Sequence, residues 1–202
     1  MTRLSLEGLT LARGSRLLIQ DLTAAFEPGA LVELTGPNGS GKTTLLRAIA
    51  GFVRPLEGAI RLGDAADAED RGSLVHLLGH RDGLKGPLSL KAHVSYWARL
   101  FAGDAAKADD ALDRVGLKGF AQLPARVLSQ GQSRRLALTR LLVAPRPVWL
   151  LDEPAAGLDR AGKQLLIDLI DQKIAEGGLI IAAVHEPIGR PAQSLPLESL
   201  TP

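Results

Sequence analysis

The stretch Leu31–Gly51 limits the possible folds of this chain more than any other. It begins with a short strand pattern, continues with a match to G-x-x-x-x-G-K-[ST], and ends with apolar residues at helical spacing. In that context glycines let backbone N–H groups turn toward phosphates, and the helix N-terminus adds positive partial charge. The sequence therefore predicts a nucleotide-binding loop. Its expected members are Gly36, Pro37, Asn38, Gly39, Ser40, Gly41, Lys42, Thr43 and Thr44.

Two residue types in this loop have specific chemistry. We expect Lys42 to reach the β- and γ-phosphates of ATP, and the Thr43 hydroxyl to be a ligand of Mg²⁺.

Far downstream, the apolar run Val148–Leu151 ends at the carboxylates Asp152 and Glu153. Combined with a phosphate loop, this pattern predicts that Asp152 holds Mg²⁺ and that Glu153 polarises the attacking water. The alternative is a pair of helix-capping acids.

A second segment could bind phosphate at a helix N-terminus. Ser129, Gln130, Gly131 and Gln132 precede a predicted helix, so the Ser129 hydroxyl and the Gly131 backbone could form a second phosphate cradle. An ordinary helix cap is the alternative interpretation.

Composition narrows the class of protein. The 202 residues suffice for one domain with an insert, and 46% hydrophobic with 23% charged residues is typical of a globular protein. The net charge is only +2 and no dense basic block is present, which argues against a nucleic-acid partner. No cysteine is present, which excludes disulfides and thiolate metal sites.

We find no signal peptide, and apolar runs of about six residues fall short of the ~20 that a bilayer span needs. Any membrane role is therefore expected to come through a partner.

Periodicity predicts the order of elements. We expect two or three strands within residues 3–27, a strand at 59–62, a polar loop at 65–71 and a strand at 74–78. Helices are predicted at 91–101 and 105–115, from near Gln132 through Leu142, and at 164–175, with strands at 148–151 and 179–184. The proline-containing end, after His185, cannot continue as one helix.

The order of these motifs resembles the nucleotide-binding subunits of ATP-binding-cassette (ABC) transporters over nearly the whole chain. The resemblance implies an α/β P-loop NTPase fold, as a single domain over residues 1–202. Residues 1–81 and 141–202 would form the α/β core with an N-terminal antiparallel β subdomain. Residues 82–140 would form an inserted α-helical subdomain that carries the signature motif at 128–132.

The same resemblance implies roles for further residues. Two copies would pair head to tail, with ATP between the P-loop of one copy and Ser129–Gly131 of the other. Glu153 would be the base, His185 would hold the γ-phosphate and the attacking water, and Asp159 would connect the two sites. Four positions depart from the family pattern. His80 replaces the Q-loop glutamine and Gln130 a signature glycine. Arg13 replaces the aromatic residue that stacks on adenine, and Ala156 replaces the D-loop serine. A guanidinium plane can still stack on a base.

The departures indicate a subgroup. The run Leu77–Lys85, with His80 and Gly83–Lys85, resembles the haem-exporter ATPases of cytochrome c maturation, the CcmA family. This implies an ATPase dimer on the cytoplasmic face of the bacterial inner membrane. It would lie beneath a CcmB-like permease, with CcmC- and CcmD-like subunits nearby, and would drive haem export or release of a haem-loaded chaperone. We expect no direct haem binding by this chain.

Three alternatives stay open at this point. The chain could energise transport of another cargo, such as a lipid or a drug. It could be a soluble ABC ATPase acting in assembly or on the ribosome, although no fused second cassette or basic arm is present. A nucleotide-gated module without hydrolysis is the third, and Glu153 with His185 argues against it.

Overall fold

The computed structural model describes residues 2–65 and 67–198. The chain divides into two compact units. The first comprises Met1–Gly79, Pro147–Pro154 and Ile170–Pro202, and the second comprises His80–Arg146 and Ala155–Leu169.

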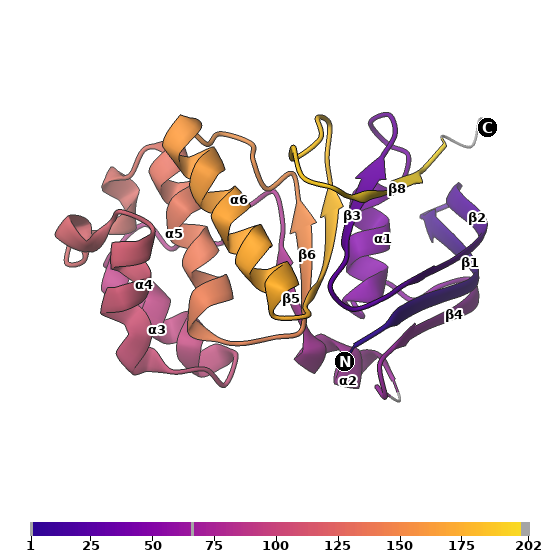
Figure 1. The fold of residues 1–202 in the computed structure, drawn as a ribbon, viewed down its shortest axis with the longest axis horizontal. Coiled ribbons are helices and arrows are strands. Elements are labelled where there is room, and N and C mark those ends of the chain that lie inside the picture. The colour runs from indigo at the N-terminus through magenta and orange to yellow at the C-terminus, as the bar shows by residue number, and fades with distance from the viewer. Residues whose placement is uncertain (1, 66, 199–202) are drawn as a thin grey trace. The chain divides into compact units, whose positions relative to one another are not determined.

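The first unit contains an antiparallel sheet of three strands in the order β2-β1-β4 (Figure 1). These are β1 (Leu4–Arg13), β2 (Arg16–Phe26) and β4 (Glu57–Leu62). A tight turn joins β1 to β2, so that Arg13 and Arg16 face each other across the hairpin. Of the two or three strands expected within residues 3–27, the structure has two, and the strand expected at residues 59–62 is confirmed.

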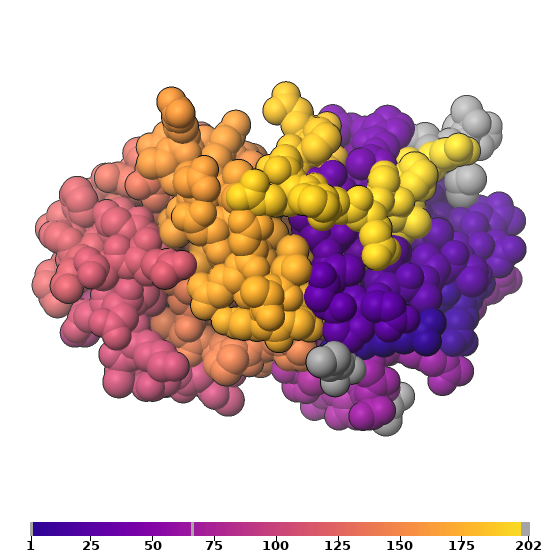
Figure 2. All heavy atoms as spheres, in the orientation of Figure 1, coloured from indigo at the N-terminus to yellow at the C-terminus, as the bar shows by residue number. Residues whose placement is uncertain are grey.

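A parallel sheet of five strands, in the order β5-β6-β7-β3-β8, forms the centre of the same unit. Strands β6 and β7 are buried at every residue, as parallel strands covered on both faces must be. Figure 2 shows the C-terminal segment lying across the N-terminal part of the chain, as the pairing of β8 with β3 requires. The strands are β3 (Leu31–Thr35), β5 (Val75–Leu78), β6 (Val148–Asp152), β7 (Leu179–Ala183) and β8 (Gln193–Pro196).

Helix α1 (Lys42–Ile49) packs into a core that both sheets share. Leu45, Leu46 and Ile49 are completely buried on it, together with apolar side chains from β1, β3 and β6. This burial holds the helix directly behind the glycine loop. The sequence prediction of an α/β P-loop NTPase fold with an antiparallel sheet is therefore confirmed.

The second unit is helical. It contains α3 (Leu90–Leu100), α4 (Ala108–Arg114), α5 (Gln130–Val143) and the first part of α6 (Arg160–Ala175). Leu90 and Val94 of α3, Leu112 of α4 and Leu138 of α5 are completely buried. Short 3-10 turns at Ala105–Lys107, Lys118–Phe120 and Ala125–Val127 connect these helices.

The structure differs from the local predictions at five places. A helix, α2 (Ala68–Leu74), lies where a polar loop was expected, because the Asp67 carboxylate caps its first N–H groups. The expected helix at 105–115 is a 3-10 turn followed by α4, and α5 and α6 begin earlier than predicted. Strand β8 was not predicted, since its residues QSLP have no alternating pattern. None of the helices in the described part of the chain is long and apolar enough to cross a membrane.

Candidate nucleotide-binding site

The glycine loop lies between β3 and α1, as predicted. Gly36, Gly39 and Gly41 all have positive φ, at 129°, 82° and 101°, which L side chains rarely adopt. A Cβ at Gly36 would also lie 2.1 Å from the Leu197 carbonyl oxygen. Gly41 is the N-cap of α1 and offers no side chain to its first turn, so these N–H groups are left for a ligand.

Ser40 adds a second indication of an anion site in the same loop. Its hydroxyl is buried, and it has no hydrogen-bond partner among the described residues. A buried polar group without a partner costs free energy, so such groups usually meet a ligand or water. The loop geometry and this hydroxyl together fit a nucleotide phosphate.

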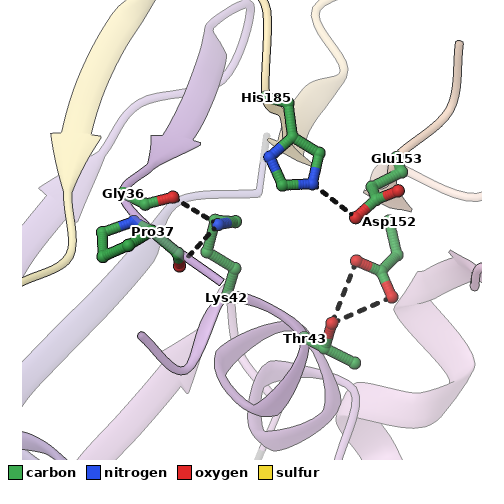
Figure 3. Close-up of polar contacts among 7 residues, drawn as sticks. All are labelled: Gly36, Pro37, Lys42, Thr43, Asp152, Glu153 and His185. Atoms are coloured by element: carbon green, nitrogen blue, oxygen red, sulfur yellow. Dashed lines mark hydrogen bonds and ion pairs between the residues drawn. The ribbon is translucent and has the colours of Figure 1, made fainter. Parts of the chain in front are cut away.

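Lys42 bends back over the loop. Its Nζ donates to the carbonyl oxygen of Gly36 at 2.5 Å and to that of Pro37 at 3.0 Å (Figure 3). The residue is only 7% exposed. The ammonium is therefore already placed at the mouth of the loop, where a phosphate oxygen could take over one of these bonds.

Thr43 and Asp152, the two residues expected to hold Mg²⁺, lie within hydrogen-bond distance of each other. The Thr43 hydroxyl lies 3.1 Å from both oxygens of the buried Asp152 carboxylate, although the two residues are 109 positions apart. Hydroxyl and carboxylate oxygens are donors that Mg²⁺ accepts, and Mg²⁺ typically uses few protein ligands plus phosphates and water. The described residues contain no group of three or more His, Cys, Asp or Glu side chains that could hold a metal ion.

Glu153 and His185 form the other half of the constellation. His185 Nε2 lies 2.9 Å from Glu153 Oε1, and the two side chains point toward each other (Figure 3). Because an ionised carboxylate only accepts, Nε2 must carry the proton in this bond. Glu153 has φ of 49°, a left-handed conformation that costs a non-glycine residue about 1–2 kcal/mol. Such strain often marks functional positions.

These side chains converge because of the sheet topology. Strands β3, β6 and β7 are parallel neighbours, so the P-loop, the two carboxylates and His185 all follow carboxyl ends at one edge. In open α/β sheets this edge is where ligands bind.

A cavity of about 260 Å³ lies against this edge. Arg13, which was expected to contact a base, lines it, and Arg16 and Leu18 line it as well. Sequence reasoning missed Arg16 and Leu18, although the hairpin register that pairs Arg13 with Arg16 could have indicated Arg16. The other lining residues are Asn38, Gly39, Gly41, Lys42, Thr43, Thr44, Asp152 and Glu153.

The remaining predicted site residues belong to the second unit. Ser129 is the N-cap of α5: its hydroxyl accepts from the Gln132 N–H, and the Gln132 side chain accepts from the Ser129 N–H. This capping box means that the helix begins at Gln130, not near Gln132 as expected. Gly131 is half-buried on the first turn, and His80 is exposed after β5.

The start of α5 packs closely against residues 157–162. A Cβ at Gly131 would lie 2.9 Å from the Gly157 carbonyl oxygen, and one at Gly157 would lie 3.3 Å from the Gln130 side chain. Gln130 therefore packs on Gly157, whose φ of 73° favours glycine. On the next turn of α5, Arg135 forms an ion pair with both carboxylate oxygens of Asp159.

Asp159 also caps α6, since its carboxylate accepts the Gly162 N–H at 2.8 Å. This bond and the Arg135 guanidinium lower the pKa of Asp159 from 3.8. A carboxyl whose pKa is lower in the folded state stabilises the protein fully above its unfolded pKa and loses that contribution on acidification.

We expect Asp159→Asn to remove part of the acid sensitivity of folding. Wild type should lose the stability contributed by this pair as the pH falls below about 3.8, whereas the variant should show no such loss. Melting temperatures of both proteins between about pH 6 and pH 3 measure the difference. Asp110→Asn, at an exposed carboxylate of α4, is the control. Parallel melting curves for Asp159→Asn and wild type across this range would contradict the assignment.

Comparison with known proteins supports the interpretation of this site as the nucleotide site of an ABC ATPase. The family model described as ABC transporter matches residues 19–156. The cytochrome c biogenesis ATP-binding export protein CcmA of Nitrobacter winogradskyi is 44% identical over 193 residues, which cover 96% of each chain. The protein of the same name from Rhodospirillum rubrum is 42% identical over 200 residues, covering 97% of this chain and 86% of its own.

Solved structures agree with these sequence relatives. An ABC transporter ATP-binding protein from Pyrococcus furiosus superimposes with a TM-score of 0.85 at 25% identity, covering 96% of this chain and 97% of its own. The cbiO1 protein of Clostridium perfringens, part of the ABC transporter complex cbiONQ, gives a TM-score of 0.74 at 26% identity, covering 91% and 78%. The chain therefore belongs to the ABC transporter family, as an ATP-binding and ATP-hydrolysing subunit in the group of cytochrome c biogenesis ATP-binding export proteins.

Proposed function

We propose that this chain is the ATPase of a haem-export complex in cytochrome c maturation, in which ATP hydrolysis drives release of a haem-loaded chaperone. The observation that carries the hydrolytic part is the convergence of the P-loop, Thr43 with Asp152, and Glu153 with His185 at one edge of the parallel sheet. The names of the relatives, together with the run from His80 to Lys85, support the place in cytochrome c maturation.

The chain's own residues divide the chemistry between them. Gly36–Thr44 bind the phosphates through backbone N–H groups, with Lys42 adding positive charge. Thr43 and Asp152 would hold Mg²⁺, which would neutralise phosphate charge and orient the leaving group. Glu153 accepts the proton of the attacking water, and His185, bonded to Glu153, orients that water and the γ-phosphate.

A second copy completes the proposed site. Ser129, Gln130, Gly131 and Gln132 of one copy contact the ATP that is bound by the P-loop of the other, and Asp159 links the two sites. Permease subunits, CcmB-like with CcmC- and CcmD-like proteins nearby, attach this dimer to the cytoplasmic face of the inner membrane. Absence of haem binding by the ATPase itself is part of the proposal.

Arg13 is proposed to stack on the base. It is exposed and lines the cavity beside Arg16. We expect Arg13→Ala to raise KM for ATP about two- to fivefold with little change in kcat, because an exposed cation–π contact is worth about 0.5–1 kcal/mol. Steady-state ATPase rates measure both constants. Arg61→Ala, on β4 and paired with Glu7, is the control. An unchanged KM would remove Arg13 from the base site.

Purification of the tagged chain from its native membranes tests the function as a whole. Small haem-handling membrane subunits should co-purify, and the haem absorbance spectrum should change on addition of ATP. A different permease without haem would keep the transporter ATPase and discard the cytochrome role. Recovery without any membrane protein would favour an ABC ATPase outside transport.

A further inference from the structure

A buried carboxylate lies in the strand that leads into the P-loop. Glu33, in the middle of β3, is only 6% exposed, and its neighbours Val32 and Leu34 are completely buried. Burying a charged group is costly unless a hydrogen bond or charge compensates for it. An acidic residue at this position of a buried parallel strand therefore requires a specific partner.

That partner is the segment between β7 and β8. The Ile188 N–H donates to Glu33 Oε1 at 2.7 Å, across 155 positions of sequence. A hydrogen bond from a backbone N–H to a carboxylate is shorter and stronger than one to a neutral acceptor. Ile188 follows His185 closely, so Glu33 anchors the segment that carries the proposed catalytic histidine.

The histidine is thus held from both sides by the same strand. Before it, the Val184 N–H donates to the Leu34 carbonyl oxygen at 3.1 Å, and after it Ile188 is bound to Glu33. Pro187, between them, fixes its own φ and restricts the residue before it. The short span around His185 therefore has little freedom, and it places His185 Nε2 2.9 Å from Glu153.

A more distant anchor holds the far part of this segment. Arg190 forms a two-pronged ion pair with Asp171 of α6, at 2.8–3.0 Å, on the exposed surface. The Arg190–Asp171 ion pair holds the part of the chain that leads into β8. The hydrogen bond between Ile188 and Glu33 lies closer in sequence to His185 and involves the strand that leads into the P-loop. The two anchors can therefore be tested separately.

We propose that Glu33 is a positioning residue for ATP hydrolysis, which holds the His185 segment on the P-loop strand so that the imidazole meets Glu153. This inference rests on the hydrolytic role proposed for His185. None of the contacts described for Glu33 reaches the residues that line the nucleotide cavity or the reacting atoms. Glu33 therefore acts through its hydrogen bond to Ile188. A displacement of about 1 Å at a catalytic group can cost up to ~100-fold in rate.

The test compares Glu33→Met with Glu33→Gln in the purified membrane complex. Methionine fills the space without an oxygen acceptor, so kcat should fall about ten- to a hundredfold while KM for ATP changes less than about twofold. Glutamine keeps an acceptor oxygen and should restore kcat to within about threefold of wild type. Val32→Ala removes buried apolar atoms from the same strand and keeps the Glu33 acceptor of the Ile188 N–H, so it serves as the control for lost stability. Melting temperatures are recorded for all variants.

A double-mutant cycle separates positioning from a structural role. In a His185→Ala background, measured by single-turnover ATP hydrolysis, Glu33→Met should cause no further loss, because its effect passes through His185. An equal loss in both backgrounds, or full activity of Glu33→Met, overturns the inference. Full activity of His185→Ala instead overturns the role proposed for His185. If Glu33→Met does not fold, Ile188→Pro removes the donor and must reproduce the loss of kcat for the inference to stand.

Discussion

Glu153→Gln is expected to abolish ATP turnover and leave ATP binding intact. Glutamine keeps the size of the side chain and can still accept the His185 hydrogen bond, but it cannot take a proton from water. General-base catalysis contributes about 10²–10⁴-fold, so kcat should fall by that factor. We propose that hydrolysis reopens the head-to-tail dimer, so ATP should trap this variant as a dimer.

Three measurements check this expectation. They are the ATPase rate of the complex, equilibrium binding of ATP, and the mass of the particle in solution with and without ATP. Glu186→Gln changes an exposed glutamate beside His185 and should behave as wild type. Turnover of Glu153→Gln within about twofold of wild type would falsify its role as the base.

Lys42→Ala is expected to raise the Kd for ATP about ten- to a hundredfold, since hydrogen bonds to charged groups contribute about 1.5–3 kcal/mol. The nearly buried ammonium lies at the mouth of the loop, bonded to the Gly36 and Pro37 carbonyls, and no other described lysine lines this cavity. Removing it takes the positive charge from the phosphate position and loosens the loop. Both effects weaken binding.

Equilibrium nucleotide binding measures this loss, and melting without nucleotide separates the loosened loop from the missing charge. Lys163→Ala, at an exposed position of α6, removes a lysine charge far from the P-loop in sequence and is expected to bind ATP normally. Normal affinity of Lys42→Ala would contradict the assignment of this loop to the phosphates.

Features with a local cause could be predicted well. The strand, glycine loop and helix around Gly36–Thr43 are contiguous, and their geometry follows from glycine and from periodicity within one short stretch. The apolar strand that ends at Asp152 and Glu153 is a pattern of the same kind. Family resemblance added His185, which follows a buried strand.

Features without a local pattern were missed. Helix α2 buries no residue, so it has no apolar periodicity, and only Asp67 as a cap could have indicated it. Strand β8 is a short edge strand whose residues extend only because β3 is available to pair with them. Arg16 looks like an ordinary exposed residue of a hairpin until the cavity beside Arg13 is seen.

By itself, the sequence indicated that this chain has a phosphate-binding loop, and it predicted a metal ligand and a base at the acidic end of a buried strand. Backbone conformation and residue type alone decide those properties. Only the tertiary structure decided that Thr43 meets Asp152, that His185 meets Glu153, and that Glu33 holds the His185 segment. These pairs are far apart along the chain, and they meet because parallel pairing sets β3, β6 and β7 side by side with their carboxyl ends at one edge.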